Sequence, residues 1–471
     1  MAYLIIILAL LLVMICVYKK ENDLLCPSIV YAASMFACCL CALVGVLSWN
    51  DIGELGILTV LIVLLSVLSF VCGNLLFNYL IKNNIVFKKR KNVHKNNNRF
   101  IWLKEHYKKN IDIFIKIKNN YKYDIKPIII SIELLIVLVT IFFMYKEVRR
   151  IAIIAGYDGI GFGNMISKFR ELSILYTTEL VENGNGINIF VSQMRKICEV
   201  ICTFNIFLIV QKIVKKEKFD LKLFSYIFIV FLCIFLSLFT GGRMQIFIYI
   251  LSFALLYLFC KYDSKCTISI IKKHTKKIII AIVVLILAFY VILPLSGRKT
   301  NSNIVSYMSF YFGTSIPSLE KYNSTSHPSP SYFGEETLRG INTVLFKIGL
   351  NDKITPISKE WYDFSDRDGN IYSSNIFTSG KRYYHDFGVL GIFVCQMIFG
   401  FVFSLLFYYS KRSNFILVFY SMYFYMCIDQ VRDELFFSEF VHINTVFKFM
   451  VLLLLFLTLK VCKKGKKKYE K

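Results

Sequence analysis

Long apolar runs separated by short polar connections set the limits on how this chain can fold. Hydrophobic residues make up 56% of its 471 residues. Several runs approach the roughly 20 residues that a helix needs to cross a lipid bilayer. A segment inside a bilayer must satisfy its own backbone hydrogen bonds, which a helix does. The sequence therefore predicts an all-α protein, a polytopic membrane helical bundle of about 11 transmembrane helices.

The predicted spans share a continuous apolar composition and end at charged or turn-forming residues. They lie at 4–18, 27–48, 56–79, 127–145, 197–213, 223–239, 245–260, 278–295, 389–409, 415–428 and 445–460. The run 415–428 is the weakest, because it falls well short of the length that a crossing helix needs.

Basic residues in the connections give the orientation. The loop 81–126 contains about 14 lysines and arginines, which the positive-inside rule places in the cytoplasm together with the tail 463–471. The amino terminus is then outside. This topology predicts an N-terminal transmembrane bundle (1–295), one large extracytoplasmic loop domain (296–388) and C-terminal transmembrane helices with a basic tail (389–471).

Arginine is concentrated on the outer side of this topology. The cytoplasmic side has about 33 lysines and about 3 arginines, whereas the outer side has about 10 of each. Arginine has a planar fork of donors that binds phosphate and carboxylate groups at two points. The uneven distribution therefore predicts that an anionic group is bound on the outer face. The net charge of +25 is explained by topology and lipid attraction, and no nucleic-acid reader motif accompanies it.

Three outer segments combine arginine with other polar residues close to span ends. The turn Thr240-Gly-Gly-Arg243 holds Arg243 at the membrane surface, where it either binds a ligand or serves as an interfacial anchor. Arg382, His385 and Asp386 share one helical face if the following helix begins early. Asp429, Arg432 and Asp433 have the same spacing, which also suits an ion-pair patch that closes the bundle.

The fourteen cysteines lie in or beside the apolar runs, where cysteine behaves as a small apolar residue. No pair has zinc-ligand spacing with a histidine partner. Neither a disulfide framework nor a metal site is expected, and no cofactor motif is present.

Several short stretches, in this order, resemble the Wzy-type polymerases that join oligosaccharide repeat units in bacterial surface polysaccharide synthesis. The stretches are Asp23 to Ser28, Thr240-Gly-Gly-Arg243, Tyr307 to Pro317, Phe333-Gly-Glu-Glu-Thr337, and Asn375 through Asp386-Phe-Gly388 and Gly391. The resemblance implies a membrane glycosyltransferase in the bacterial cytoplasmic membrane. Its substrate would be an undecaprenyl-diphosphate-linked oligosaccharide, and its partners membrane lipids, a chain-length regulator and a flippase.

In such an enzyme, arginines would bind the diphosphate that leaves during transfer. We expect Arg243, Arg298, Arg382 and Arg432 to do so, because they are the outer arginines closest to span ends. A base would accept the proton of the acceptor hydroxyl. His385, Asp386 and Asp433 are the candidates, and the first two rank above Asp433 because they lie in the stretch that most resembles the family. Asp386 could instead cap a helix that begins near Gly388.

Two other classes remain open. A ligase or related glycosyltransferase would use the same lipid-linked donor and need the same residue types. A flippase would also need arginines and many spans, but charges inside the spans and two similar halves would be expected of it. A purely structural or receptor protein would use the outer loop only for binding.

Overall fold

The computed structural model describes residues 1–82, 121–175, 186–241, 243–262, 266–270, 272–276, 304–351 and 360–463. Eight of its helices are long and apolar enough to cross a membrane. They are α1 (Ala2–Glu21), α2 (Pro27–Gly45), α3 (Ile57–Lys82), α5 (Pro127–Ile154), α8 (Ile189–Val214), α9 (Leu221–Leu238), α10 (Met244–Lys261) and α15 (Ser379–Ser410). The chain is therefore a largely helical, multi-pass membrane protein.

The other predicted spans differ in how the structure forms them. Residues 414–429 form two short helices, α16 (Asn414–Tyr423) and α17 (Tyr425–Asp429), and the last predicted span is the short helix α18 (Ile443–Leu457). The predicted span 278–295 lies outside the described residues.

Two of the long helices begin well before the apolar runs that predicted them. Helix α8 begins at Ile189 instead of residue 197, and α15 begins at Ser379 instead of residue 389. Helix α15 also changes direction at Gly388, whose φ of 65° lies in the left-handed region that favours glycine. The predicted boundary between the loop domain and the C-terminal helices therefore falls at a kink inside one helix.

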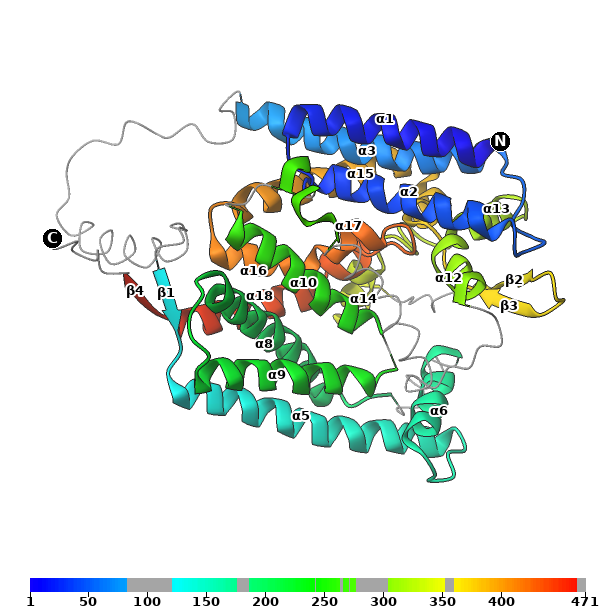
Figure 1. Cartoon of the computed structure of the whole chain (residues 1–471). Helices are drawn as coiled ribbons and strands as arrows, with labels where there is room; N and C mark the ends of the chain where they lie inside the picture. Colours follow the sequence, from blue (N-terminus) through cyan, green and yellow to red (C-terminus); the bar gives the residue numbers. More distant parts are fainter. Residues whose placement is uncertain are drawn as a thin grey trace.

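The helices form two groups with shorter helices between them (Figure 1). One group contains α1, α2, α3 and α15, and the other contains α5, α8 and α9. Helices α3 and α15 pack closely at two glycines, one from each helix. A Cβ atom on Gly73 would lie 2.1 Å from the Met397 carbonyl oxygen, and one on Gly400 would lie 2.1 Å from the Phe70 carbonyl oxygen. Small residues of this kind let membrane helices approach closely.

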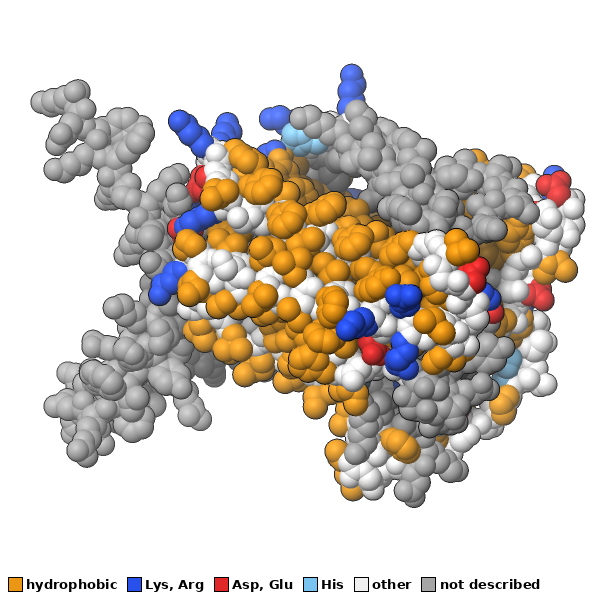
Figure 2. Space-filling model, turned by 90° about the horizontal axis from the view of Figure 1, so that it is seen from below, with side chains coloured by type: hydrophobic (Ala, Val, Ile, Leu, Met, Phe, Trp, Pro, Cys, Tyr) orange, Lys and Arg blue, Asp and Glu red, His pale blue; other side chains and the backbone are white. Residues whose placement is uncertain are grey.

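The two ends of the bundle have different structures (Figure 1). At one end, strand β1 (Tyr121–Asp124) pairs antiparallel with β4 (Lys460–Lys463), which joins the chain before α5 to the carboxyl-terminal segment. At the opposite end lie the amino terminus, α6 (Phe162–Leu175), α12 (Ile304–Gly313), α13 (Ser315–Asn323), and the hairpin of β2 (Tyr362–Ser365) and β3 (Ile371–Ser374). Helix α14 (Arg339–Lys347) lies between the two ends in this view. Between the ends, a broad hydrophobic band covers α5 and α9 (Figure 2).

The β2–β3 hairpin is fixed to the connection between α2 and α3. Trp49 is 2% exposed, packs in a small core with Ile52 and Phe364, and lies beside Asp366 in an isolated β-bridge. The Ser365 amide donates to the Asp51 carboxylate at 2.6 Å. Full burial of a side chain of this size contributes about 2–3 kcal/mol. The hairpin is thereby held in place beside the ends of the long helices.

Candidate functional site

Arg243 and Arg432 converge on the ring of Tyr311, toward the end of the bundle that contains the β2–β3 hairpin. Arg243 immediately precedes α10 and donates from Nη2 to the Tyr307 hydroxyl at 3.0 Å. Arg432 follows α17 and donates from Nη2 to the Tyr311 hydroxyl at 3.1 Å. Their guanidinium carbons lie 5.2 and 4.7 Å from the centre of the Tyr311 ring, within cation–π range. Two of the four predicted arginines are thus brought together, while Arg298 lies outside the described residues.

A cavity of about 600 Å³ opens beside this pair. Arg432 and Arg170 contribute its guanidinium groups, and the rings of Tyr311, Trp361 and Tyr372 form much of its aromatic wall. The other polar lining groups are the hydroxyl, amide and carboxylate side chains of Ser167, Ser373, Ser374, Asn375 and Glu171. The volume is within the range of ligand pockets, and the lining combines aromatic faces with a few polar groups.

Arg432 is held in its charged form. Its Nη1 atom lies 3.4 Å from the Asp429 carboxylate. Burial disfavours the charge, but Asp429 and the Tyr311 hydroxyl outweigh it and raise the pKa of Arg432 above its ordinary value. The Nε atom of Arg432 is buried and has no hydrogen-bond partner among the described residues.

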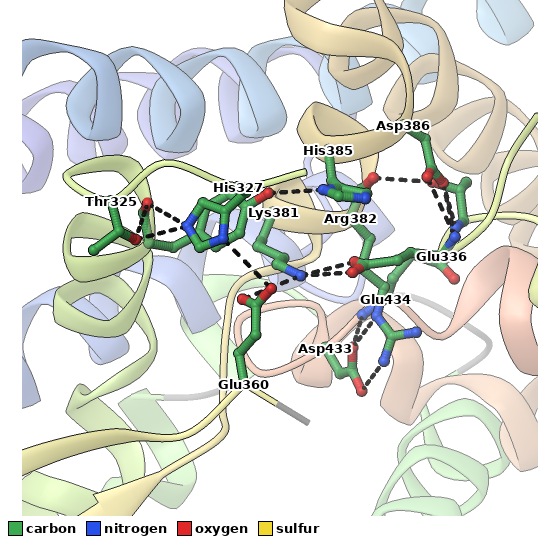
Figure 3. A network of polar contacts seen from close by, with 12 residues as sticks. Thr325, His327, Glu336, Glu360, Lys381, Arg382, His385, Asp386, Asp433 and Glu434 are labelled. Carbon is green, nitrogen blue, oxygen red and sulfur yellow. Dashed lines mark hydrogen bonds and ion pairs between the residues drawn. The ribbon is translucent and has the colours of Figure 1, made fainter. Parts of the chain in front are cut away.

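Arg382 is bound to a carboxylate of the protein itself (Figure 3). Its Nε and Nη2 atoms donate to the two carboxylate oxygens of Asp433 at 2.7 and 2.8 Å. The Asp433 side chain is 45% exposed, whereas that of Arg382 is 17% exposed. The early start of α15, at Ser379, places Arg382 in its first turn. The predicted ion-pair patch therefore exists, but Asp433 pairs across to α15 while Arg432 pairs with Asp429.

Asp386 binds backbone amides of another segment. Its carboxylate accepts from the Thr337 amide at 2.6 Å and from the Glu336 amide at 3.1 Å. One turn earlier, Lys381 donates to both carboxylate oxygens of Glu336 at 2.7 and 2.9 Å (Figure 3). Asp386 therefore fixes the segment that leads into α14, and this contact, not a cap of the helix after Gly388, is what its carboxylate makes.

His385 faces a different cavity. Its Nδ1 atom is 2.8 Å from the Tyr322 hydroxyl, and the ring of Tyr322 stacks on His327 with centroids 3.8 Å apart. His385, His327 and Tyr384 line a cavity of about 430 Å³ whose lining residues are all different from those of the arginine cavity. The structure thus separates His385 from Arg432.

Several residues beyond the predicted ones belong to this region. Arg339 begins α14, and burial followed by the charge of Arg382 lowers its pKa. Glu434 is fully buried and accepts from the Tyr383 hydroxyl at 3.0 Å, and burial raises its pKa from 4.5 to about 7. Both residues could have been suspected from their positions, because Glu434 follows Asp433 and Arg339 follows the motif Phe333 to Thr337. Tyr311 lies in the aromatic run already noted.

Among the described residues, no group of three or more His, Cys, Asp or Glu side chains could hold a metal ion. Comparison of the chain with protein-family models, with curated proteins and with solved structures gives no match.

Proposed function

We propose that this protein polymerises undecaprenyl-diphosphate-linked oligosaccharide repeat units into a surface polysaccharide at the outer face of the bacterial cytoplasmic membrane. The observation that supports this best is the convergence of Arg243 and Arg432 on Tyr311, next to a cavity of about 600 Å³. The motifs that resemble the repeat-unit polymerases include both Thr240 to Arg243 and Tyr307 to Pro317, and the structure brings these two stretches into contact.

The position of the two arginines suits a lipid-borne diphosphate. Arg243 lies at the start of α10 and Arg432 just beyond the end of α17, so both are at helix ends. Helix α10 is long and apolar enough to cross a membrane, so the headgroup of a lipid carrier would lie near its end, beside Arg243 and the Tyr311 ring that Arg243 shares with Arg432. A guanidinium placed at the leaving diphosphate would stabilise the charge that develops there, by about 3–4 kcal/mol for each well-placed donor.

The rest of the cavity suits the sugar that is attached to the diphosphate. Rings such as Trp361 and Tyr372 offer apolar faces against which a sugar ring can pack, and Tyr has a polar hydroxyl as well. The Ser373 and Asn375 side chains can donate to and accept from sugar hydroxyls.

The transfer balances without a cofactor. The acceptor hydroxyl oxygen forms a bond to the anomeric carbon of the donor, and the bond from that carbon to the diphosphate oxygen breaks. The bonding electrons leave with the lipid diphosphate, and the hydroxyl proton passes to a base. We propose Asp433 as the base, because it adjoins Arg432 in the chain and its side chain is 45% exposed. Both of its carboxylate oxygens accept from Arg382, so one of these bonds must be exchanged for the acceptor hydroxyl. Asp386 is engaged with backbone amides, and His385 faces another cavity.

A flippase for the same lipid-linked sugars is the second candidate. The observation that favours it is the ion pair between Glu199 and Lys448, at 2.6 Å, on two apolar helices of the bundle. Charges within spans are typical of transport pathways. A ligase would share the site geometry of a polymerase and differ in its acceptor.

Deletion of the gene followed by sizing of the surface polysaccharide separates these functions. Loss of a polymerase leaves single repeat units at the surface. Loss of a flippase leaves no sugar outside, and loss of a ligase leaves long but unattached chains. Restoration of long chains by the wild-type gene, but not by Arg432→Lys, would connect the activity to the arginine cavity. Either of the other two deletion phenotypes would reject the polymerase.

A further inference from the structure

A second polar cavity, of about 420 Å³, lies among the ends of α8, α10 and α18 that are nearest to Arg243. Arg195, Glu199 and Thr203 line it at intervals of four residues, so they lie on one face of α8. The first and last of them are separated by about 12 Å along the helix axis. The cavity therefore extends about two helical turns into the bundle.

The charges that line this cavity balance one another. Three side chains are basic and three are acidic, namely Arg195, Lys196 and Lys448 against Glu199, Asp429 and Glu439. Lys448 lies 2.6 Å from Glu199, and Glu439 accepts from the Tyr425 hydroxyl at 2.8 Å. The cavity beside Tyr311 differs, because Arg170 and Arg432 face the single acid Glu171 among its lining residues.

This lining suits a neutral ligand that is rich in hydroxyl groups. Hydroxyl and amide side chains, including those of Thr203, Gln245 and Ser438, stand among the charged ones. A sugar hydroxyl can donate to a carboxylate and accept from an arginine or lysine. A lining with equal numbers of acidic and basic side chains can therefore form hydrogen bonds with several hydroxyls at once. Glu199 lies 2.6 Å from Lys448 and 3.9 Å from Arg195, so an anion would compete with a carboxylate of the protein for both cations. An acyl chain would leave these polar groups unsatisfied.

The two cavities meet at one ion pair. Asp429 lines the cavity among α8, α10 and α18, and it lies 3.4 Å from Arg432, which lines the cavity beside Tyr311. A ligand with a diphosphate at one end and sugars at the other could occupy both sides of this pair. We propose that the cavity among α8, α10 and α18 binds a sugar of the repeat unit and thereby selects the oligosaccharide that is polymerised. This inference rests on the proposed function.

The test measures binding of two probes to the purified full-length protein in lipid nanodiscs. The first probe is the oligosaccharide released by mild acid from the lipid-linked repeat unit of cells that lack this gene. The second is undecaprenyl diphosphate without sugar. Gln245 lines the cavity in the first turn of α10, so Gln245→Trp fills the space and Gln245→Leu removes the amide at similar volume. Ile250→Trp is the matched control, because Ile250 is on the same helix, is 42% exposed and does not line the cavity.

Wild type and Ile250→Trp should bind the oligosaccharide, whereas Gln245→Trp should bind it at least tenfold more weakly and Gln245→Leu a few-fold more weakly. All four proteins should bind undecaprenyl diphosphate with the same affinity. Arg432→Lys should bind undecaprenyl diphosphate more weakly and the oligosaccharide as wild type does. If wild type does not bind the oligosaccharide, or Gln245→Trp binds it as wild type does, the inference is wrong. If Gln245→Trp is not recovered folded, unchanged binding by Gln245→Leu decides against it in the same way.

Failure of the proposed function has a separate signature. Wild-type nanodiscs supplied with the extracted lipid-linked repeat unit should form longer chains. Elongation that is normal in wild type and in both Gln245 variants would overturn the sugar site alone. Absence of elongation by wild type, with the lipid-linked unit intact, would overturn the polymerase itself.

Discussion

Arg382 and Asp433 form a two-point ion pair, with Nε and Nη2 of the arginine 2.7 and 2.8 Å from the two carboxylate oxygens. The residues are 51 positions apart, one in the first turn of α15 and the other just beyond Arg432. The pair therefore fixes the turn that carries Arg432 to a long helix. This geometry gives Arg382 a positioning role for the turn that carries Arg432, and its predicted contact with a diphosphate stays a prediction.

Asp433→Asn should reduce chain growth by about 10²–10⁴-fold, because the amide cannot accept the proton of the acceptor hydroxyl. Asparagine keeps one acceptor for Arg382, and the side chain is half exposed, so the protein should still insert and unfold near its normal temperature. Polysaccharide length on gels and initial rates in nanodiscs measure the effect. Asp368→Asn, an exposed carboxylate at the same end, is the control. A normal rate in Asp433→Asn would assign the base elsewhere.

Arg243→Lys and Arg432→Lys should each shorten the polysaccharide. Lysine keeps the charge but loses the planar fork and its stacking on Tyr311. We expect about a 10-fold or larger loss of initial rate, because a single transition-state donor is worth a few kcal/mol. Arg149→Lys, at an exposed position, should leave the rate unchanged. Wild-type chain length in both Arg243→Lys and Arg432→Lys would rule out the diphosphate role.

Hydropathy predicted most of the long helices but placed the start of two of them too late in the chain. The run 197–213 missed the first turns of α8 because Arg195 and Lys196 lower the local hydropathy. Both side chains line a polar cavity, where a charged group can be accommodated inside the bundle, so the helix continues through them. Likewise, Lys381 and Arg382 obscured the start of α15, although both are paired with carboxylates in the structure.

The candidate site was predicted in part, for a similar reason. Residue type and closeness to span ends singled out Arg243 and Arg432, and the structure brings them together. Spacing along one helix could not show that Asp433 pairs with Arg382, because that contact joins residues 51 positions apart. Nor could it show that Asp386 would meet the amides of Glu336 and Thr337. Tertiary contacts at such separations have no signature in local periodicity.

Asp386→Asn should loosen the segment before α14 more than it impairs the chemistry. The carboxylate accepts from two backbone amides, and a neutral side chain would weaken these charge-assisted bonds by about 1 kcal/mol in total. Hydrogen exchange at the Glu336 and Thr337 amides should become several-fold faster, with less than a tenfold loss of chain growth. Unchanged exchange together with abolished growth would instead identify Asp386 as the base.

Glu434 should make stability depend on pH near neutrality. Burial raises the pKa of its carboxyl from 4.5 to about 7, although backbone amides and Arg382 oppose the shift. Between these values the folded protein holds a proton that the unfolded chain has released. Raising the pH from 4.5 to 7 therefore removes stability, by about 3 kcal/mol for this group, and no further loss follows above that range.

The Glu434→Gln variant tests this dependence, since glutamine does not titrate. Its unfolding temperature in nanodiscs should rise relative to wild type as the pH is raised from 5 to 8. Other titrating groups are common to both proteins and cancel in the difference. A constant difference at the two pH values would show that Glu434 does not titrate in this window.

The orientation of the bundle can be tested with single cysteines at its two ends. Ser329 and Asp368 are exposed at the end that contains α13 and the β2–β3 hairpin, and Lys218 is exposed between α8 and α9 at the end where β1 and β4 pair. The positive-inside rule, applied to the lysine-rich connections, predicts that the second end is cytoplasmic. Cysteines at Ser329 and Asp368 should therefore react with an impermeant thiol reagent in intact cells, and a cysteine at Lys218 should react only after the cells are permeabilised. The parent protein, labelled in parallel, accounts for reaction at the native exposed Cys16 and Cys72. The reverse pattern would place Arg243 and Arg432 on the cytoplasmic side, where a polymerase that uses exported lipid-linked sugars could not work.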